Sequence, residues 1–450
     1  MRDIILTAIL LGALPFVLWR PTIGVFLWTW VSVMSPHRLT WGFAQDFRFG
    51  YLIAIATLAG LFLTKEPKQL PLTPVTIVLA LLVMWMNVST FFAIDIGLSL
   101  EMWKQVIKSM LMLFVALYVL HSKRHVHVLM WIVTLSVAFY GVKGGLFTLR
   151  STGENVVYGP AGSFIEDNNA LALATIMTIP LLFYLFMHGT RHWLRWGLLP
   201  AMVLCGFSAL GSHSRGGFLA IAVMLAFLWW KGRSKVVTGL VLILLVPVAI
   251  GFMPDKWVDR MYTIENYEQD GSAMGRINAW EMAFNVAKDR PVGGGFEMAS
   301  RSVFARYAPD PTVVRAAHSI YFQVLGEHGF LGLALFLVLW ILVWRDASWI
   351  IGQSRSHKDL QWASDLARMI QVSLVGYFVG GAFLSLAYYD VPYELVVALV
   401  VTRILVAKAI KGVDQEEEAS MPLMNPGKAG SHHAVSTTRF KQRIYTDKTR

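Results

Sequence analysis

Apolar runs long enough to cross a membrane recur through residues 1–410, and they constrain the fold more than any other feature of this chain. A helix needs about 20 residues to cross a hydrocarbon core roughly 30 Å thick. The runs lack the alternation of polar and apolar residues that marks membrane strands, so helices are the only spanning structure left. A content of 56% hydrophobic and 15% charged residues agrees with this class. The sequence therefore predicts an all-α polytopic membrane protein.

The expected spans form a regular series of crossings. After residue 34 they are 50–64, 72–94, 105–121, 126–146, 168–187, 194–212, 216–230, 236–253, 318–345, 367–388 and 392–410. Apolar residues also fill 1–34, where Arg20-Pro21 interrupts the run and favours two half-length segments. One net crossing in that region gives about twelve transmembrane helices, with both ends of the chain on the same side.

Basic residues in the short loops predict the orientation, because Lys and Arg near span ends resist translocation. The loops expected inside are 65–68, 122–125, 191–195, 231–235 and 345–368. The alternate loops, with the large segment 254–317 among them, are then expected outside. Four regions follow: transmembrane helices with short loops over 1–253, an outer helical loop subdomain over 254–317, C-terminal transmembrane helices over 318–410, and a disordered inside tail over 411–450.

Charge and cysteine usage exclude several classes of partner and chemistry. The net charge of +11 is explained by topology and by contact with membrane lipids, so no nucleic-acid partner is expected. Cys205, the one cysteine, lies within an apolar run, where it predicts neither a disulfide nor thiol chemistry. The outer loops hold no Asp-x-Asp pair and no His/Cys cluster, so no metal is expected.

Three polar residues lie at the expected outer ends of spans. Arg215 sits in Ser-His-Ser-Arg-Gly-Gly between two apolar runs, Arg276 lies in the outer segment, and His318 opens the next span. A guanidinium offers the paired donors that suit a diphosphate, and an imidazole suits proton removal near neutral pH. Each residue alone has a plain alternative, namely lipid snorkelling, stacking on Trp280, or an interfacial hydrogen bond. Together they indicate a site that grips a diphosphate and deprotonates a hydroxyl.

Further candidates for substrate contact flank this group. They are Lys143, Arg150, Tyr158, Asp167, Asn168, Trp280, Ser319 and Glu327. A helix cap is the simpler explanation for Asp167 and Asn168. Glu327 follows His318 by nine residues, about half a turn around a straight helix, and only a break at Gly326 or Gly329 would change this relation.

The outer segment 254–317 is expected to contain an amphipathic helix. Ser272 can cap it, and its apolar stripe is formed by Ile277, Trp280, Phe284 and Ala287. Such a helix, ending before Pro291, is expected to lie across the outer mouth of the membrane domain as a lid.

The order of these pieces resembles the O-antigen ligase and polymerase superfamily. The resemblance rests on Ser214-Arg215-Gly216-Gly217, Arg276-x-x-x-Trp280 followed by Pro291 and Gly293 to Gly295, His318-Ser319, and Glu327-x-Gly329. It covers most of residues 50–410. The loop Tyr158-Gly159-Pro160-x-x-Ser163-Phe164 with Asp167-Asn168-Asn169 is also similar to exosortase-associated O-glycosylation ligases.

The resemblance implies a metal-independent, inverting glycosyl transfer at the periplasmic face of a bacterial inner membrane, with the segment 254–317 in the periplasm and the tail in the cytoplasm. The donor would be a glycan on undecaprenyl diphosphate, and the acceptor a hydroxyl of the lipid A core oligosaccharide. Arg215 and Arg276 would hold the diphosphate leaving group, and His318 would act as base. Neither a nucleotide nor another cofactor is needed, because the donor arrives activated.

Three alternatives share some of these features. A polymerase of repeat units or a protein O-glycosylation ligase would use the same donor with a different acceptor. A transporter of lipid-linked glycans belongs to another class, but transporters commonly show internal repeats and midplane charges, and the polar residues here gather at one face instead. A structural scaffold would not explain positive charge beside a histidine at the outer mouth.

Overall fold

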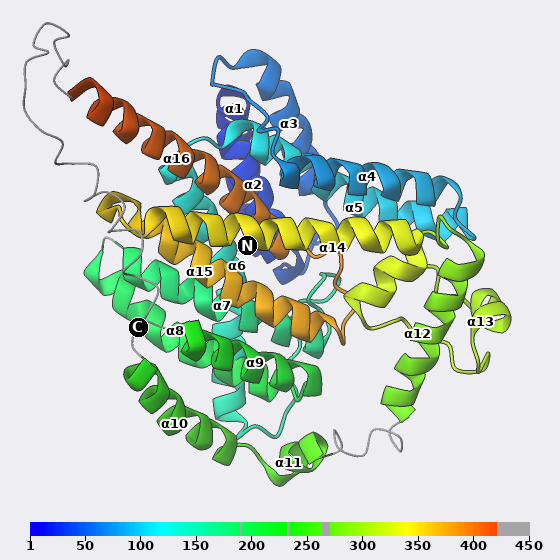
Figure 1. The fold of residues 1–450 in the computed structure, drawn as a ribbon. Helices are drawn as coiled ribbons and strands as arrows, with labels where there is room; N and C mark the ends of the chain where they lie inside the picture. Colours follow the sequence, from blue (N-terminus) through cyan, green and yellow to red (C-terminus); the bar gives the residue numbers. More distant parts are fainter. Residues whose placement is uncertain (190, 232–234, 263–270, 421–450) are drawn as a thin grey trace, which may run out of the picture. The chain divides into compact units, whose positions relative to one another are not determined.

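The computed structural model describes residues 1–189, 191–231, 235–262 and 271–420, and the secondary structure of these residues is helical. The helices in chain order (Figure 1) are α1 Arg2–Trp19, α2 Pro21–Met34, the 3₁₀ helix η1 Pro36–Leu39, α3 Phe49–Leu63, α4 Pro74–Phe91, α5 Ile96–Val119, α6 Lys123–Arg150, α7 Asn168–His188, α8 His192–Gly211, α9 Arg215–Lys231, α10 Lys235–Gly251, α11 Asp255–Tyr262, α12 Gly271–Asp289, α13 Arg301–Tyr307, α14 Ile320–Ser354, the 3₁₀ helix η3 Lys358–Leu360, α15 Gln361–Gly381 and α16 Asp390–Ser420. The expected all-α class is confirmed for this part of the chain.

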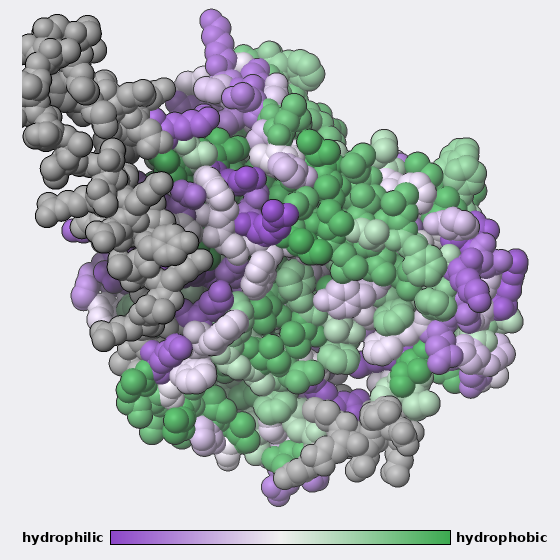
Figure 2. Space-filling model, in the orientation of Figure 1, coloured by the Kyte–Doolittle hydropathy of each residue, from purple (hydrophilic) through white to green (hydrophobic). Residues whose placement is uncertain are grey.

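The protein is a multi-pass membrane protein. Among the described residues, seven helices are long and apolar enough to cross a membrane, namely α1, α4, α5, α6, α7, α8 and α14. The long helices present a mostly hydrophobic surface, whereas hydrophilic side chains gather over α12 and α13 (Figure 2). The expected number of about twelve spans is not established, because α2, α3 and α9 are shorter than a full crossing.

Helix boundaries follow local chemistry that the sequence makes visible. Thr73 precedes Pro74 and accepts from the amide of Thr76, while Asp95, Ser122 and Asp167 cap α5, α6 and α7 in the same way. These caps satisfy amides that have no partner within the helix. The break expected at Arg20-Pro21 is present, and it separates α1 from α2.

The chain divides into two compact units, Met1–Val406 and Ala407–Arg450. The second unit begins within α16, which continues to Ser420. The first ten residues of the expected disordered tail, 411–420, are therefore helical. Glu, Gln and Ala favour helix, and no proline interrupts this stretch before Pro422. Residues 421–450 of the expected tail lie outside the described residues.

In the first unit, α14 packs between α4 and α15, and α12 lies against its N-terminal half (Figure 1). The segments 35–48, 151–167 and 212–214 connect helices at the same end of the bundle as α12. Arg38 touches Gly162, the amide of Val157 donates to the carbonyl of Gly211, and the amide of Ile94 donates to Gly294 beyond α12. We call this region the α12 end.

The expected helix in the outer segment is present as α12, but Ala287 is the one residue of the expected apolar stripe that is buried. It begins at Gly271, so Ser272 lies within it. Its buried core consists of Ala279, Met282, Ala283 and Val286, packed with Val303 and Phe304 of α13. Ile277, Trp280 and Phe284 instead line a groove, because the side chains of α13 cover the neighbouring face. Residues 263–270 of the segment lie outside the described residues.

A break interrupts α14 at Gly329, where φ is 68° and ψ is −173°. Such a break frees three consecutive carbonyls that a continuous helix would satisfy. The amide of Gly294 donates to the Gly326 carbonyl at 2.8 Å, the amide of Gly295 to Glu327 at 2.9 Å, and the indole of Trp85 to His328 at 2.7 Å. The glycine turn after α12 therefore completes the backbone of a membrane helix.

Replacing Gly329 by Ala is expected to lower the free energy of unfolding by about 2–4 kcal/mol. The backbone conformation opposes any side chain, and the added Cβ would lie 2.1 Å from the Pro291 carbonyl oxygen. Thermal unfolding of the purified protein in detergent measures the change. Gly352→Ala is the matched control in the same helix, since its Cβ meets nothing within 4 Å. Equal melting temperatures for the two variants would contradict this role of Gly329.

Candidate functional site

His318 lies in the short connection that leads from the α12 segment into α14. Its backbone is left-handed, with φ at 42°, which is uncommon for a residue with a side chain and is often associated with functional sites. Trp280 of α12 holds this connection in two ways. Its indole donates to the carbonyl of Ala317 at 2.7 Å, and its ring stacks on Phe322 with centroids 5.0 Å apart and planes 5° apart. Trp280 therefore positions the backbone that presents His318.

The surroundings of His318 favour a neutral imidazole. Burial lowers the pKa of His318 below its ordinary 6.5, the nearby Arg276 lowers it further, and Asp167 acts in the opposite direction. Arg276 lies one helical turn before Trp280 on α12. The structure thus brings three of the expected residues, Arg276, His318 and Asp167, close enough for their charges to interact.

Arg215 occupies the first position of α9 and is half-buried. Ser214 accepts from the amide of Gly217 at 3.0 Å, so it caps the helix whose positive end lies beside Arg215. The preceding turn is fixed by the amide side chain of Asn168, which donates to the carbonyl of Ser212 at 2.7 Å. Asp167, the cap of α7, is the residue before Asn168. Arg215 and the group around His318 are therefore held at the same end of the helices by one loop.

Four further residues were expected to bind substrate, and they lie in two different places. Tyr158 is 64% exposed on the loop 151–167, and Ser319 is buried at the N-cap position of α14. Lys143 and Arg150 lie on the exposed face of α6, which also carries Phe139 and Phe147. This face is opposite the glycines that pack on α8, so the structure does not bring Lys143 or Arg150 to Arg215. The assignment of all four to substrate binding stays a prediction.

Glu327 is buried and belongs to a network that sequence inspection missed. Its carboxylate accepts from the hydroxyl of Tyr388 and from the amide of Glu297 at 3.1 Å. The same hydroxyl contacts Nε2 of His328 at 2.8 Å, and Nδ1 of His328 contacts Ser89 at 2.6 Å. The tautomer of His328 decides which atom donates in the contact between Nε2 and the Tyr388 hydroxyl.

The break in α14 does not turn Glu327 toward His318. The break lies at Gly329, beyond Glu327, and the carboxylate is directed to Tyr388 of the α15–α16 connection. Adjacent His328 could have marked this network in the sequence, but its partners are 60 and 239 residues away along the chain. Within the described residues, no three His, Cys, Asp or Glu side chains are grouped as a metal site.

Comparison with known families gives two matches, which together cover most of residues 1–337. Residues 200–337 match the family described as O-Antigen ligase, and residues 1–190 match a family of unknown function (DUF5935). No curated protein gives a significant match. The stretch 200–337 contains Arg215, Arg276 and His318, so the superfamily resemblance that these motifs carry is confirmed.

Tyr388→Phe is expected to lower the free energy of unfolding by about 1–3 kcal/mol, because it leaves the buried Glu327 and His328 without a shared partner. Chemical or thermal unfolding in detergent tests this. Tyr118→Phe is a suitable control, since that hydroxyl makes no hydrogen bond to the described residues. An unchanged stability of Tyr388→Phe would show that the network contributes nothing to the fold.

Proposed function

Because residues 200–337 belong to the O-antigen ligase superfamily, we propose that this membrane protein transfers a glycan from a lipid-linked diphosphate donor to an acceptor hydroxyl. The observation that carries the proposal is the placement of a histidine with a lowered pKa beside Arg276, at the end of the helices that also holds Arg215. In finer detail, the donor is a glycan on undecaprenyl diphosphate, and the acceptor is the lipid A core oligosaccharide. The site faces the periplasm of a bacterial inner membrane.

Arg215 and Arg276 stabilise the diphosphate that leaves. As the bond between the anomeric carbon and the diphosphate oxygen breaks, its electron pair moves to that oxygen, and negative charge increases there. Two guanidinium groups and the positive end of α9 oppose this charge without a metal ion. The acceptor oxygen attacks from the opposite side of the sugar, which inverts the anomeric configuration.

His318 accepts the proton of the attacking hydroxyl. An imidazole can do so only in its neutral form, and burial together with Arg276 favours that form. The left-handed backbone of His318 and the grip of Trp280 on Ala317 fix the position from which it acts. Trp280 contributes by positioning His318.

An apolar groove supports a polyprenyl donor. The groove encloses about 400 Å³ and is lined by Ile277, Trp280, Phe284 and Phe322, with Glu281 and Asn285 at its edge. Ile277 directly follows Arg276 in α12, and Trp280 lies one helical turn beyond Arg276. A lipid chain lying in this groove would place its diphosphate head beside Arg276.

Transfer by the purified protein tests the proposal directly. Lipid-linked glycan and lipid A core are incubated in detergent with a chelator and without nucleotide, and the acceptor mass is followed. His318→Ala is expected to lower the rate by about 10²–10⁴-fold, and Arg215→Ala and Arg276→Ala by about 10²–10³-fold. Arg306→Ala is the control, since Arg306 is an exposed residue of α13 that pairs with Asp289.

The products decide between the alternatives. Lengthening of the donor glycan would identify a polymerase, and a modified protein would identify a protein O-glycosylation ligase. Transfer that proceeds equally well in His318→Ala and Arg276→Ala would overturn the proposed site. Movement of intact donor across vesicles without any transfer would identify a transporter.

The rate of single-turnover transfer is expected to decline as the pH falls, with a midpoint below 6.5. The rate falls in acid because protonation removes the base. The lowered pKa of His318 keeps the base neutral at a pH where an ordinary histidine is half protonated. His318→Ala should lack this decline. A midpoint above 6.5 in the parent protein would contradict the assignment of the base.

A further inference from the structure

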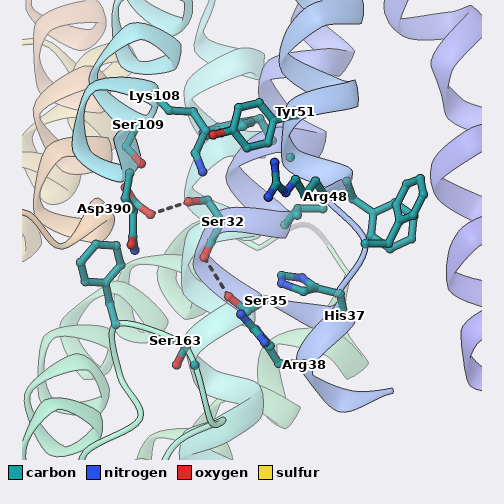
Figure 3. Close-up of a pocket in the computed structure, with 18 of the residues that line it drawn as sticks. Ser32, Ser35, His37, Arg38, Arg48, Tyr51, Lys108, Ser109, Ser163 and Asp390 are labelled. Carbon is teal, nitrogen blue, oxygen red and sulfur yellow. Dashed lines mark hydrogen bonds between the residues drawn. The ribbon is translucent and has the colours of Figure 1, made fainter. Parts of the chain in front are cut away.

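A second cavity lies at the α12 end, in the region that matches the family of unknown function (Figure 3). It encloses about 540 Å³, within the range of small-molecule sites. Its walls come from α2, the segment 35–51, the first half of α5, the loop at 162–164, and Asp390 at the start of α16. Residues distant in sequence thus converge on one hollow.

The cavity is lined by four basic side chains, Arg38, Arg48, Lys104 and Lys108, and by three acidic ones, Asp46, Glu101 and Asp390. The carboxylates neutralise these cations incompletely. Arg38 lies 3.9 Å from Asp46, whose side chain is 92% exposed. Asp390 accepts hydrogen bonds from Ser32 (Figure 3) and from Ser109, and it also interacts with the charge of Lys108. The cavity therefore has cationic donors available for a ligand.

Two buried polar atoms of residues in the cavity wall, Nε of Arg38 and Nδ1 of His37, have no hydrogen-bond partner among the described residues. Buried polar atoms are normally paired, because leaving them unpaired costs about 1–3 kcal/mol each. Burial and the adjacent Arg38 also lower the pKa of His37, which favours a neutral ring with one donor and one acceptor. The neutral His37 ring therefore adds an acceptor as well as a donor to the polar groups around the cavity.

Aromatic rings stand beside these charges. Nζ of Lys108 lies 5.0 Å from the ring of Tyr51 and 5.8 Å from that of Trp28, and the guanidinium of Arg48 lies 6.0 Å from Tyr51. A sugar presents apolar C–H faces that pack on such rings, and its hydroxyls need both donors and acceptors. The cavity lining supplies hydrogen-bond donors and acceptors, and its basic side chains outnumber its acidic ones.

The cavity is physically linked to the site of His318. The guanidinium carbon of Arg38 would lie only 2.9 Å from a Cβ added at Gly162, so the loop 151–167 packs directly on the cavity wall. Asp167 is five residues further along this loop, and five residues span at most about 18 Å. The loop that forms part of the cavity wall therefore also carries Asp167, whose charge acts on His318.

We propose that this cavity binds an anionic saccharide, one that carries a carboxylate or a phosphate group, and that this saccharide is part of the acceptor. Arg38 and Lys108 contact its negative group, and Tyr51 packs against a sugar ring. Only the role as acceptor rests on the proposed glycosyl transfer; the binding itself does not.

Binding is measured by calorimetry with the full-length protein in detergent and no donor. The probes are a galacturonic acid trimer, a neutral galactose trimer of the same length, and short-chain phosphatidylglycerol. The anionic trimer is expected to bind at least about tenfold more tightly than the neutral one. Arg38→Gln and Lys108→Gln are each expected to weaken its binding by about tenfold, while Arg306→Gln, on exposed α13, leaves it unchanged. Unfolding temperatures confirm that the variants are folded.

Three other binding results would overturn the proposed saccharide site. Equal binding of the neutral trimer would remove the role of charge, and binding of phosphatidylglycerol alone, with the same sensitivity to Arg38→Gln, would identify a lipid headgroup site. Absence of binding by both trimers would leave no saccharide site. His318→Ala separates the two proposals, since it should abolish transfer and leave trimer binding intact. If the parent protein binds the trimer but transfers no glycan, the proposed function fails and the saccharide site stands.

Discussion

The arrangement at the α12 end depends on how the broken membrane helix α14 satisfies its backbone. A break at Gly329 inside hydrocarbon would leave three carbonyls unpaired, and each unpaired group is costly where no water can reach it. The donors come from the glycine turn after α12 and from Trp85 of α4. The segment that carries Arg276 is thereby tied to the helix that follows His318. The position of the candidate base relative to the arginine depends on these backbone bonds.

Much of the helical framework could be predicted, because apolar runs and caps are local properties. The expected span 168–187 corresponds to α7, Asn168–His188, with Asp167 as its cap. The buried face of α12 could not be predicted in the same way, since it depends on packing against α13, a helix of seven residues with little periodicity to detect. The charged residues and prolines of 411–450 predict a disordered tail, but the helix propensity of residues 411–420 extends α16 to Ser420.

The candidate site was predictable in part. Arg215, Arg276 and His318 stand out as polar groups at the ends of apolar runs, whereas the partners of Glu327 come from the α15–α16 connection and from the turn after α12. The second cavity was missed, although a signal existed. Arg38, Arg48 and Lys104 lie where the loop charges place the outer side, and cations are disfavoured on that side. Basic residues that oppose the charge rule can therefore mark a binding site.

The bond between Tyr388 and Glu327 also has a consequence for how the protein is made. Tyr388 follows Glu327 by 61 residues, so α14 emerges from the ribosome well before its hydroxyl partner exists. At about 5–20 residues per second, the delay is roughly 3–12 s. During that interval the Glu327 and His328 side chains must remain near water or beside other polar groups, since hydrocarbon would penalise them. Glu327 and His328 therefore gain their shared buried partner only after the α15–α16 connection has been synthesised, whereas Ser89 and the amide of Glu297 are available earlier.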